Sequence, residues 1–238
     1  RGVFLKYSKI EHVLSVDKIE HPIVREAFAM MGITELQHEI TTLADIPAGT
    51  GLGSSGSFTT ALLKALYSFE RRLLLPGDLA RLACELEIDR LGRPVGTPDQ
   101  YIAAYGGITC FEFDRTGEVH AEPLAMAQTT LHELEDHLLL FFTGFSRSAS
   151  DILKDQDVRT KSADTSMVEG LHYVKELGHR SRKALEDGKP AAFAEIMHEH
   201  WERKRQRSSG MSNPQIDDWY ERGRKAGAGA FEVFRAMQ

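Results

Sequence analysis

A glycine-rich turn at residues 47–57, PAGTGLGSSGS, constrains this 238-residue chain more than any other feature. Its alternate glycines, Gly49, Gly51 and Gly53, remove Cβ atoms, so the backbone can adopt positive φ and approach an anion closely. The serines that follow begin a run of good helix formers, and the free N–H groups and dipole of a helix N-terminus favour phosphate. The turn therefore predicts a phosphate-binding loop that leads into a helix.

Two better-known phosphate-binding loops do not fit these residues. A P-loop needs a lysine directly after its glycines, and no lysine follows here. A dinucleotide-binding loop needs GxGxxG, and in this turn the third glycine comes one residue early. On glycine spacing alone, a plain turn that caps a helix is an equal alternative, but the ordered string is far more specific than the spacing.

The composition narrows the class of protein. Hydrophobic residues make up 42% of the chain and charged residues 27%, which suits one large or two small globular domains. The formal net charge of −6 gives no general attraction to nucleic acid or an anionic membrane, and no apolar run reaches the ~18 residues of a membrane-spanning helix. Cys84 and Cys110 lack CxxC spacing, which favours reduced thiols. We therefore expect a cytoplasmic protein that binds neither nucleic acid nor membrane.

Hydrophobic periodicity predicts strands and helices in mixed order. Strands are expected at 3–10, 36–44, 108–113, around 119–123, 137–145 and 230–236. Helices are expected at 23–31, 54–70, 78–91, 99–105, 148–155, 163–187, 190–207 and 213–226. The order shows neither strict strand–helix alternation nor an internal repeat, so the expected fold class is α+β.

A pair of carboxylates follows the turn. Glu87 lies near the end of one expected helix and Asp99 near the start of the next, so the connection between them could bring both to one site. Phosphoryl transfer needs a ligand for Mg²⁺ and a group that orients or deprotonates the acceptor hydroxyl. Taken alone, the two residues are more simply a solvated carboxylate and a helix cap.

The turn resembles the second signature of the GHMP kinases, P-x-G-x-G-L-G-S-S-A, with Gly56 where these kinases commonly have alanine. The spacing from Glu87 to Asp99, and the string Gly96-x-x-Asp99-Gln100, resemble their carboxylate pattern. The resemblance implies the two-domain GHMP kinase fold. Residues 1–130 would form the ribosomal-protein-like α/β ATP-binding domain and residues 131–238 a ferredoxin-like domain.

The same resemblance implies ATP and Mg²⁺ as cofactors and assigns roles to residues. Asp99 is expected to be the catalytic base, and Glu87, with the hydroxyls of Ser54 and Ser55, to hold the metal. The residues expected to bind ATP are Pro47, Gly49, Thr50, Gly51, Leu52, Gly53, Ser54, Ser55, Gly56 and Ser57.

Longer strings at 44–66, 92–113, 138–153 and 198–220 resemble D-glycero-D-manno-heptose 7-phosphate kinases, with a departure at Thr97-Pro98. The resemblance implies phosphorylation of the anomeric hydroxyl of that heptose phosphate, and a homodimer as the possible assembly. A sugar phosphate needs a cationic partner. Arg147 is the candidate, with Gly106 and Gly107 as further substrate-binding residues; the basic run at 203–207 is a second candidate or a solvated helix face.

Two alternatives stay open. The first is another GHMP sugar kinase that acts on fucose or galactose, and the second is a catalytically silent binding module of the same fold. The segment P-x-R-I-x-x-x-G-x-x-D, which usually opens such kinases and holds the acceptor, is not recognisable. Their late glycine-rich turn is matched only by a shortened string at 225–231. The resemblance therefore predicts that the sequence lacks the first segment of its N-terminal domain.

Overall fold

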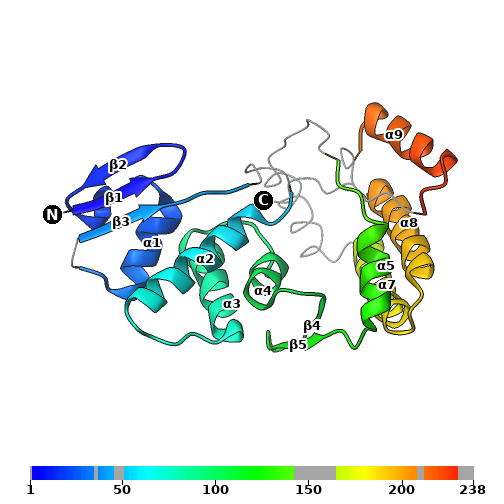
Figure 1. Ribbon diagram of the computed structural model, residues 1–238, viewed down its shortest axis with the longest axis horizontal. Helices are drawn as coiled ribbons and strands as arrows, with labels where there is room; N and C mark the ends of the chain where they lie inside the picture. Colours follow the sequence, from blue (N-terminus) through cyan, green and yellow to red (C-terminus); the bar gives the residue numbers. More distant parts are fainter. Residues whose placement is uncertain (1, 35–36, 46–50, 142–164, 208–211, 230–238) are drawn as a thin grey trace. The chain divides into compact units, whose positions relative to one another are not determined.

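The computed structural model of the chain describes residues 2–34, 37–45, 51–141, 165–207 and 212–229 (Figure 1). These residues form two compact units, one up to Gly107 and one from Ile108 onward. The division falls earlier than the expected boundary at 130, because the hairpin after Gly107 groups with the second unit. The identities of the two predicted domains stay predictions.

The first unit opens with a three-stranded sheet of β1 (Gly2–Lys6), β2 (Ile10–Val13) and β3 (Gln37–Thr41), in the order β2-β1-β3. β1 runs antiparallel to β2 and parallel to β3, so Val3 lies opposite both Val13 and His38. The prediction of one strand over 3–10 was wrong. The chain turns there, with Tyr7 N–H donating to Lys9 O at 2.8 Å, and the alternation of side chains resumes in β2.

The connection from β2 to β3 runs through the 3₁₀ turn η1 (Val16–Lys18) and helix α1 (Pro22–Met31). α1 begins with proline at its first position, where no N–H is needed, and ends at Gly32 with φ of 67°. Its buried face packs against Val3 and Leu5 of β1. That face consists of Ile23, Val24, Ala27 and Phe28.

Three helices complete the first unit and carry the residues of interest (Figure 1). They are α2 (Ser54–Phe69), α3 (Pro76–Cys84) and α4 (Pro98–Tyr105). The helix expected over 78–91 does not stay regular, because α3 continues into a π-helical turn, η2 (Glu85–Arg90). The wider turn buries both Leu86 and Glu87. Single π turns inside helices are frequent at functional sites.

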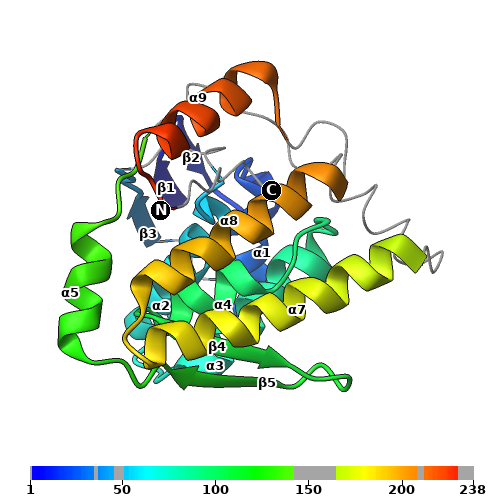
Figure 2. The same cartoon turned by 90° about the vertical axis from the view of Figure 1, so that its right-hand side faces the viewer.

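The second unit contains a hairpin of β4 (Thr109–Phe113) and β5 (Val119–Pro123), as predicted, with Phe111 opposite Ala121. Its helices are α5 (Gln128–Asp136), α7 (Thr165–Glu186), α8 (Pro190–Arg207) and α9 (Pro214–Lys225). α7 and α8 lie side by side (Figure 2) and bury Leu177, Ala184 and Ile196. α9 contributes to a second apolar cluster, which consists of Trp201, Ile216 and Tyr220.

Other predictions for the second unit had mixed outcomes. α5 was not predicted, and residues 138–141 of the expected strand 137–145 are not in a strand and expose their side chains. The rest of that strand, the helix expected at 148–155 and the strand at 230–236 lie outside the described residues. Both cysteines are free thiols, as expected. Within the described ranges, a helix with the length and apolar character to span a bilayer is not found.

Leu63 on α2 is fully buried in the core of the first unit, whereas Leu73 is 90% exposed, so the two leucines form a matched pair. We expect Leu63→Ala to lower the free energy of unfolding by about 2–5 kcal/mol, through lost burial and the cavity left behind. Leu73→Ala should change it by less than about 0.5 kcal/mol. Urea unfolding followed by circular dichroism measures both, and equal losses would contradict this assignment of the core.

Candidate active site

The N-termini of α2 and α4 meet closely in the first unit. A Cβ atom on Gly53 would lie 3.3 Å from Asp99 Cγ, and one on Gly56 would lie 3.1 Å from both Asp99 Cβ and Gln100 N. Glycine at position 56 thus has a packing reason, since it lets the backbone of α4 approach α2. The contact places Asp99 at the start of α2.

The described part of the predicted phosphate loop has the backbone conformation that its glycines suggested. Gly51 and Gly53 have φ of 81° and 67°, and Ser57 N–H donates to Gly53 O at 2.9 Å to form the first hydrogen bond of α2. The N–H groups of the first turn of any helix have no intrahelical acceptor and favour an anion. Pro47, Gly49 and Thr50 lie outside the described residues, so ATP binding by the loop stays a prediction.

Glu87 is completely buried, with 0% of its surface exposed. Its Oε2 accepts hydrogen bonds from Ser55 Oγ and from Arg93 Nη1, the latter at 3.1 Å, and its Oε1 accepts one from Gln100 Nε2 at 3.2 Å. Burying a carboxylate costs several kcal/mol unless it is paired and hydrogen-bonded. Glu87 is therefore not a solvated residue but the centre of a polar cluster joined by four segments of the chain.

The cluster provides the kind of ligands that a divalent cation needs. Gln100 is 1% exposed, and within the described part of the chain its Oε1 has no hydrogen-bond partner. Hydroxyl, carboxylate and amide oxygens are the donors that Mg²⁺ prefers. Ser55 Oγ, Glu87 Oε2 and a cation, Arg93, already lie together. The residues thus fit a magnesium ion, with Ser55 rather than Ser54 bonded to Glu87.

Asp99 is partly buried beside this cluster. Burial raises the pKa of its carboxyl above the ordinary value, and the negative charge of Glu87 raises the pKa further. A general base works best when its pKa lies near the operating pH, so an upward shift favours that role for a carboxylate.

Sequence reasoning missed Arg93. Its Nη1 donates to Ser55 Oγ at 2.6 Å, and its backbone N–H donates to Glu87 O at 3.0 Å. Gly92, with φ of 61°, makes the turn that brings Arg93 back toward Glu87. The sequence carries no clear signal for Arg93, because only the structure shows that Glu87 is buried and needs a cation beside it.

Residues 21–107 match the family model of the GHMP kinases N terminal domain. The chain carries this domain of the GHMP kinases. It is 30% identical over 203 residues to D-glycero-alpha-D-manno-heptose 7-phosphate kinase of Campylobacter jejuni, covering 82% of this chain and 59% of that protein. It is 28% identical over 208 residues to the bifunctional fucokinase/GDP-fucose pyrophosphorylase of Arabidopsis thaliana, covering 84% of this chain and 20% of that protein.

Among solved structures, a D-glycero-D-manno-heptose 1-phosphate kinase from Bacteroides thetaiotaomicron matches with a TM-score of 0.74 and 26% identity, covering 98% of this chain and 69% of that one. This match confirms the predicted α+β GHMP kinase fold. The chain spans 59% of the length of the C. jejuni protein and 20% of the length of the A. thaliana protein.

The glycines predicted to bind substrate lie away from Asp99. Gly106 and Gly107 follow the C-terminus of α4, while Asp99 lies in its first turn. A helix of eight residues separates the two ends by about 12 Å. Both glycines have positive φ, 71° and 64°, a backbone conformation that favours glycine. Arg147 lies outside the described residues, so substrate binding by all three stays a prediction.

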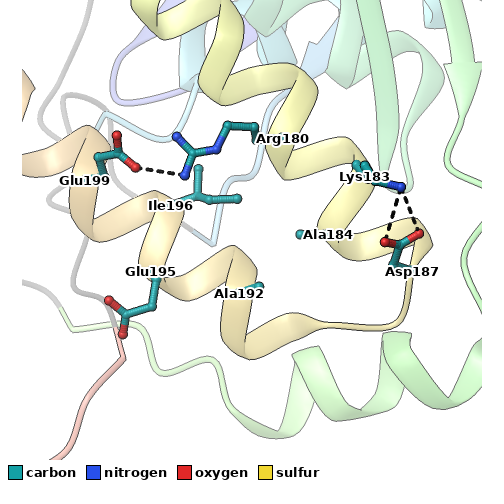
Figure 3. A pocket seen from close by; sticks show the side chains of 8 residues that line it. All are labelled: Arg180, Lys183, Ala184, Asp187, Ala192, Glu195, Ile196 and Glu199. Atoms are coloured by element: carbon teal, nitrogen blue, oxygen red, sulfur yellow. Dashed lines mark hydrogen bonds and ion pairs between the residues drawn. The ribbon is translucent and has the colours of Figure 1, made fainter.

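Charged clusters of the second unit are engaged in ion pairs. In the groove between α7 and α8 (Figure 3), Arg180 pairs with Glu199 at 3.0 Å and Lys183 with Asp187 at 3.4 Å. In the basic run at 203–207, Arg205 pairs with Glu202 at 2.8 Å, and the guanidinium of Arg203 lies over Tyr173. These contacts favour the solvated-face interpretation of the basic run over a phosphate site.

The raised pKa of Asp99 has a consequence for stability. The folded protein holds the Asp99 proton more tightly than the unfolded chain, so the folded state loses stability as pH rises from about the ordinary value of 3.8 through the raised pKa. We expect Asp99→Asn, which mimics the protonated acid, to raise the thermal midpoint at pH 7.5, by on the order of 2 °C.

The gain from Asp99→Asn should shrink as the pH falls toward 3.8 and vanish well below that value, where the wild-type side chain is protonated in both states. Thermal unfolding followed by circular dichroism from about pH 2.5 to 8 measures the difference. Asp89→Asn is the control, because Asp89 is exposed. A gain of equal size at every pH, or one shared by the control, would contradict the desolvation of Asp99.

Proposed function

We propose that this protein transfers the γ-phosphoryl group of ATP to the anomeric hydroxyl of D-glycero-D-manno-heptose 7-phosphate. The observation that carries the proposal is the buried Glu87, bonded to Ser55 and lying beside Asp99 at the N-terminus of α2. Phosphoryl transfer requires little covalent chemistry from a protein, and depends on positioning and on neutralising charge. The N-terminus of α2 and the proposed cation site at Ser55 and Glu87 would neutralise charge on the phosphates. The carboxylate of Asp99, whose pKa is raised, would position and deprotonate the acceptor hydroxyl.

The N-terminus of α2 is the proposed site for the triphosphate, which its free N–H groups and dipole would stabilise. Ser55 Oγ and Glu87 Oε2 are the atoms proposed to hold Mg²⁺. When bound, the ion supplies positive charge that neutralises the phosphate oxygens. Gln100 orients Glu87 by donating to Oε1 at 3.2 Å, which leaves Oε2 for the cation.

Asp99 is the proposed general base. Its carboxylate would accept the proton of the sugar hydroxyl as that oxygen attacks the γ-phosphorus. The bond from the γ-phosphorus to the oxygen of the β-phosphate then breaks, ADP leaves, and the proton on Asp99 returns to solvent. The upward shift of its pKa supports the role, because it makes Asp99 a stronger base than an ordinary aspartate.

The acceptor is proposed from the relatives. One protein similar to this chain is named a heptose 7-phosphate kinase and another a heptose 1-phosphate kinase, so a phosphorylated heptose is the acceptor class that both names share. A fucose-type kinase is the second candidate, favoured by the 28% identity to a protein with a fucokinase half. A silent binding module is disfavoured, because it has no need of Glu87 and Asp99 together.

The proposal is tested by following ADP release from Mg-ATP with a panel of acceptors. The panel contains the heptose 7-phosphate, the heptose 1-phosphate, the free heptose, L-fucose and D-galactose. We expect the highest kcat/KM with the 7-phosphate, and at least about a hundredfold less with the free heptose, because a lost charge-assisted phosphate contact costs a few kcal/mol. Equal turnover of the free heptose or faster turnover of L-fucose would refute the acceptor. Mg-ATP binding without any turnover would favour the binding module.

The roles of the two carboxylates predict different kinetic signatures. Asp99→Asn should lower kcat by about 10²–10⁴-fold and leave the Kd of Mg-ATP nearly unchanged, since it removes only the base. Glu87→Gln should weaken Mg-ATP binding, since it removes a ligand of the metal. Stopped-flow turnover and calorimetry separate the two effects, with Asp89→Asn as control. Near-normal turnover of Asp99→Asn would exclude the base role.

A further inference from the structure

Arg93 lies where the proposed function places a metal ion. Its Nη1 is 2.6 Å from Ser55 Oγ and 3.1 Å from Glu87 Oε2, and Ser55 in turn donates to the same carboxylate oxygen. One guanidinium nitrogen therefore bridges the two oxygens that are proposed to hold Mg²⁺. The Glu87 carboxylate is fully buried, whereas the Arg93 side chain is 32% exposed.

The guanidinium and a metal ion cannot both bind these two oxygens. Mg²⁺ binds its ligands at about 2.0–2.1 Å and demands near-octahedral geometry. Glu87 Oε2 already accepts hydrogen bonds from both Ser55 Oγ and Arg93 Nη1, so the ion needs the lone pair that the guanidinium now occupies. An ion bound to these oxygens would also lie next to the Arg93 guanidinium. The two positive charges would repel each other, because the buried Glu87 carboxylate between them is shielded from water. Binding of the ion thus requires that Arg93 Nη1 break its hydrogen bonds to Ser55 Oγ and Glu87 Oε2.

Arg93, rather than its neighbour His21, supplies the positive charge next to Glu87. His21 stacks on Phe58 of α2, with ring centroids 4.9 Å apart, and its Nδ1 accepts a hydrogen bond from Val24 N–H. Burial lowers the pKa of His21, an effect that the nearby Glu11 opposes and the charge of Arg93 reinforces. The imidazole is therefore neutral at pH 7.5, and the guanidinium balances the buried carboxylate.

We propose that Arg93 is the resident counter-cation of the magnesium site, an inference that rests on the proposed function of Ser55 and Glu87. In the metal-free protein Arg93 neutralises the charge of Glu87 and occupies the position that the metal ion would take. When the metal binds with its nucleotide, Arg93 leaves the two oxygens and turns toward solvent. The displacement needs no helix to move, because Arg93 lies in the turn between η2 and α4, directly after Gly92.

The test is the binding of Mn²⁺, a paramagnetic substitute for Mg²⁺, to the protein without nucleotide, measured by electron paramagnetic resonance. Arg93→Gln should bind Mn²⁺ about tenfold more tightly than the wild type, because the ion no longer displaces a charge-assisted hydrogen bond. The same variant should have a lower thermal midpoint in the presence of chelator, since the buried Glu87 carboxylate is left without a counter-cation. A merely structural role for Arg93 would weaken Mn²⁺ binding instead.

Two further variants keep the test decisive. Arg90→Gln is the matched control, because Arg90 pairs with the exposed Glu85 side chain at 3.4 Å, and it should leave Mn²⁺ affinity unchanged. Arg93→Lys retains a cation and should fold as the wild type does, with an affinity between those of the wild type and Arg93→Gln. In Glu87→Gln/Arg93→Gln the tighter binding should disappear.

An Mn²⁺ affinity of Arg93→Gln that is unchanged or weaker, including no measurable binding, overturns the proposal. The measurement uses no sugar and no turnover, so its failure is separable from failure of the kinase proposal. If the wild type phosphorylates its acceptor but Mn²⁺ binding is not tightened, only the role of Arg93 is refuted. If Mn²⁺ binding is tightened but no acceptor is phosphorylated, the cation site stands and the reaction assigned to it does not.

Discussion

The buried carboxylate of Glu87 is the constraint on which the rest of the site depends. An isolated charge in a protein interior costs several kcal/mol, so the native packing is stable only while the partners of Glu87 converge on it. Those partners come from α2, α4 and the turn after η2, through Ser55, Gln100 and Arg93. Satisfying this one charge therefore fixes the relative positions of the segments that a phosphoryl-transfer site would use.

The close contact of α2 with α4 adds a second constraint. Because Gly53 and Gly56 have no Cβ, the first turn of α4 can lie against the first turn of α2, and Asp99 comes to the point where two helix dipoles are positive. The same packing desolvates Asp99 and exposes it to the charge of Glu87, which together raise its pKa. The absence of Cβ atoms at Gly53 and Gly56 thus has two effects. It brings together two helix N-termini that favour an anion, and it places a carboxylate of raised pKa beside them.

Local signals in the sequence were enough to predict the elements that carry the site, and not enough to predict how they meet. The proline and glycine that bound α1, and the glycine that precedes α2, mark helix ends through backbone requirements that act within a few residues. The split of 3–10 into two strands was missed because the residues of the tight turn, Tyr7 to Lys9, include neither glycine nor proline to mark it. The π turn at Glu85–Arg90 depends on packing, and the contact of Arg93 with Ser55 joins residues 38 apart, which no local spacing encodes.

The polar cluster is not explained by stability. In the core of the same unit, Leu63 and Leu86 are buried with no exposed surface, so the first unit has the means to fill its interior with apolar side chains. Replacing a buried ion pair by well-packed apolar residues is often neutral or stabilising. This chain instead keeps three polar groups in one place: the buried Glu87 carboxylate, the Gln100 amide oxygen, which has no hydrogen-bond partner among the described residues, and the half-buried Asp99 carboxyl. Each of these groups weakens the fold. A polar cluster that weakens the fold is retained when its charges interact with a ligand. This is the strongest physical reason to test the cluster around Glu87 for binding of the ion and the phosphates.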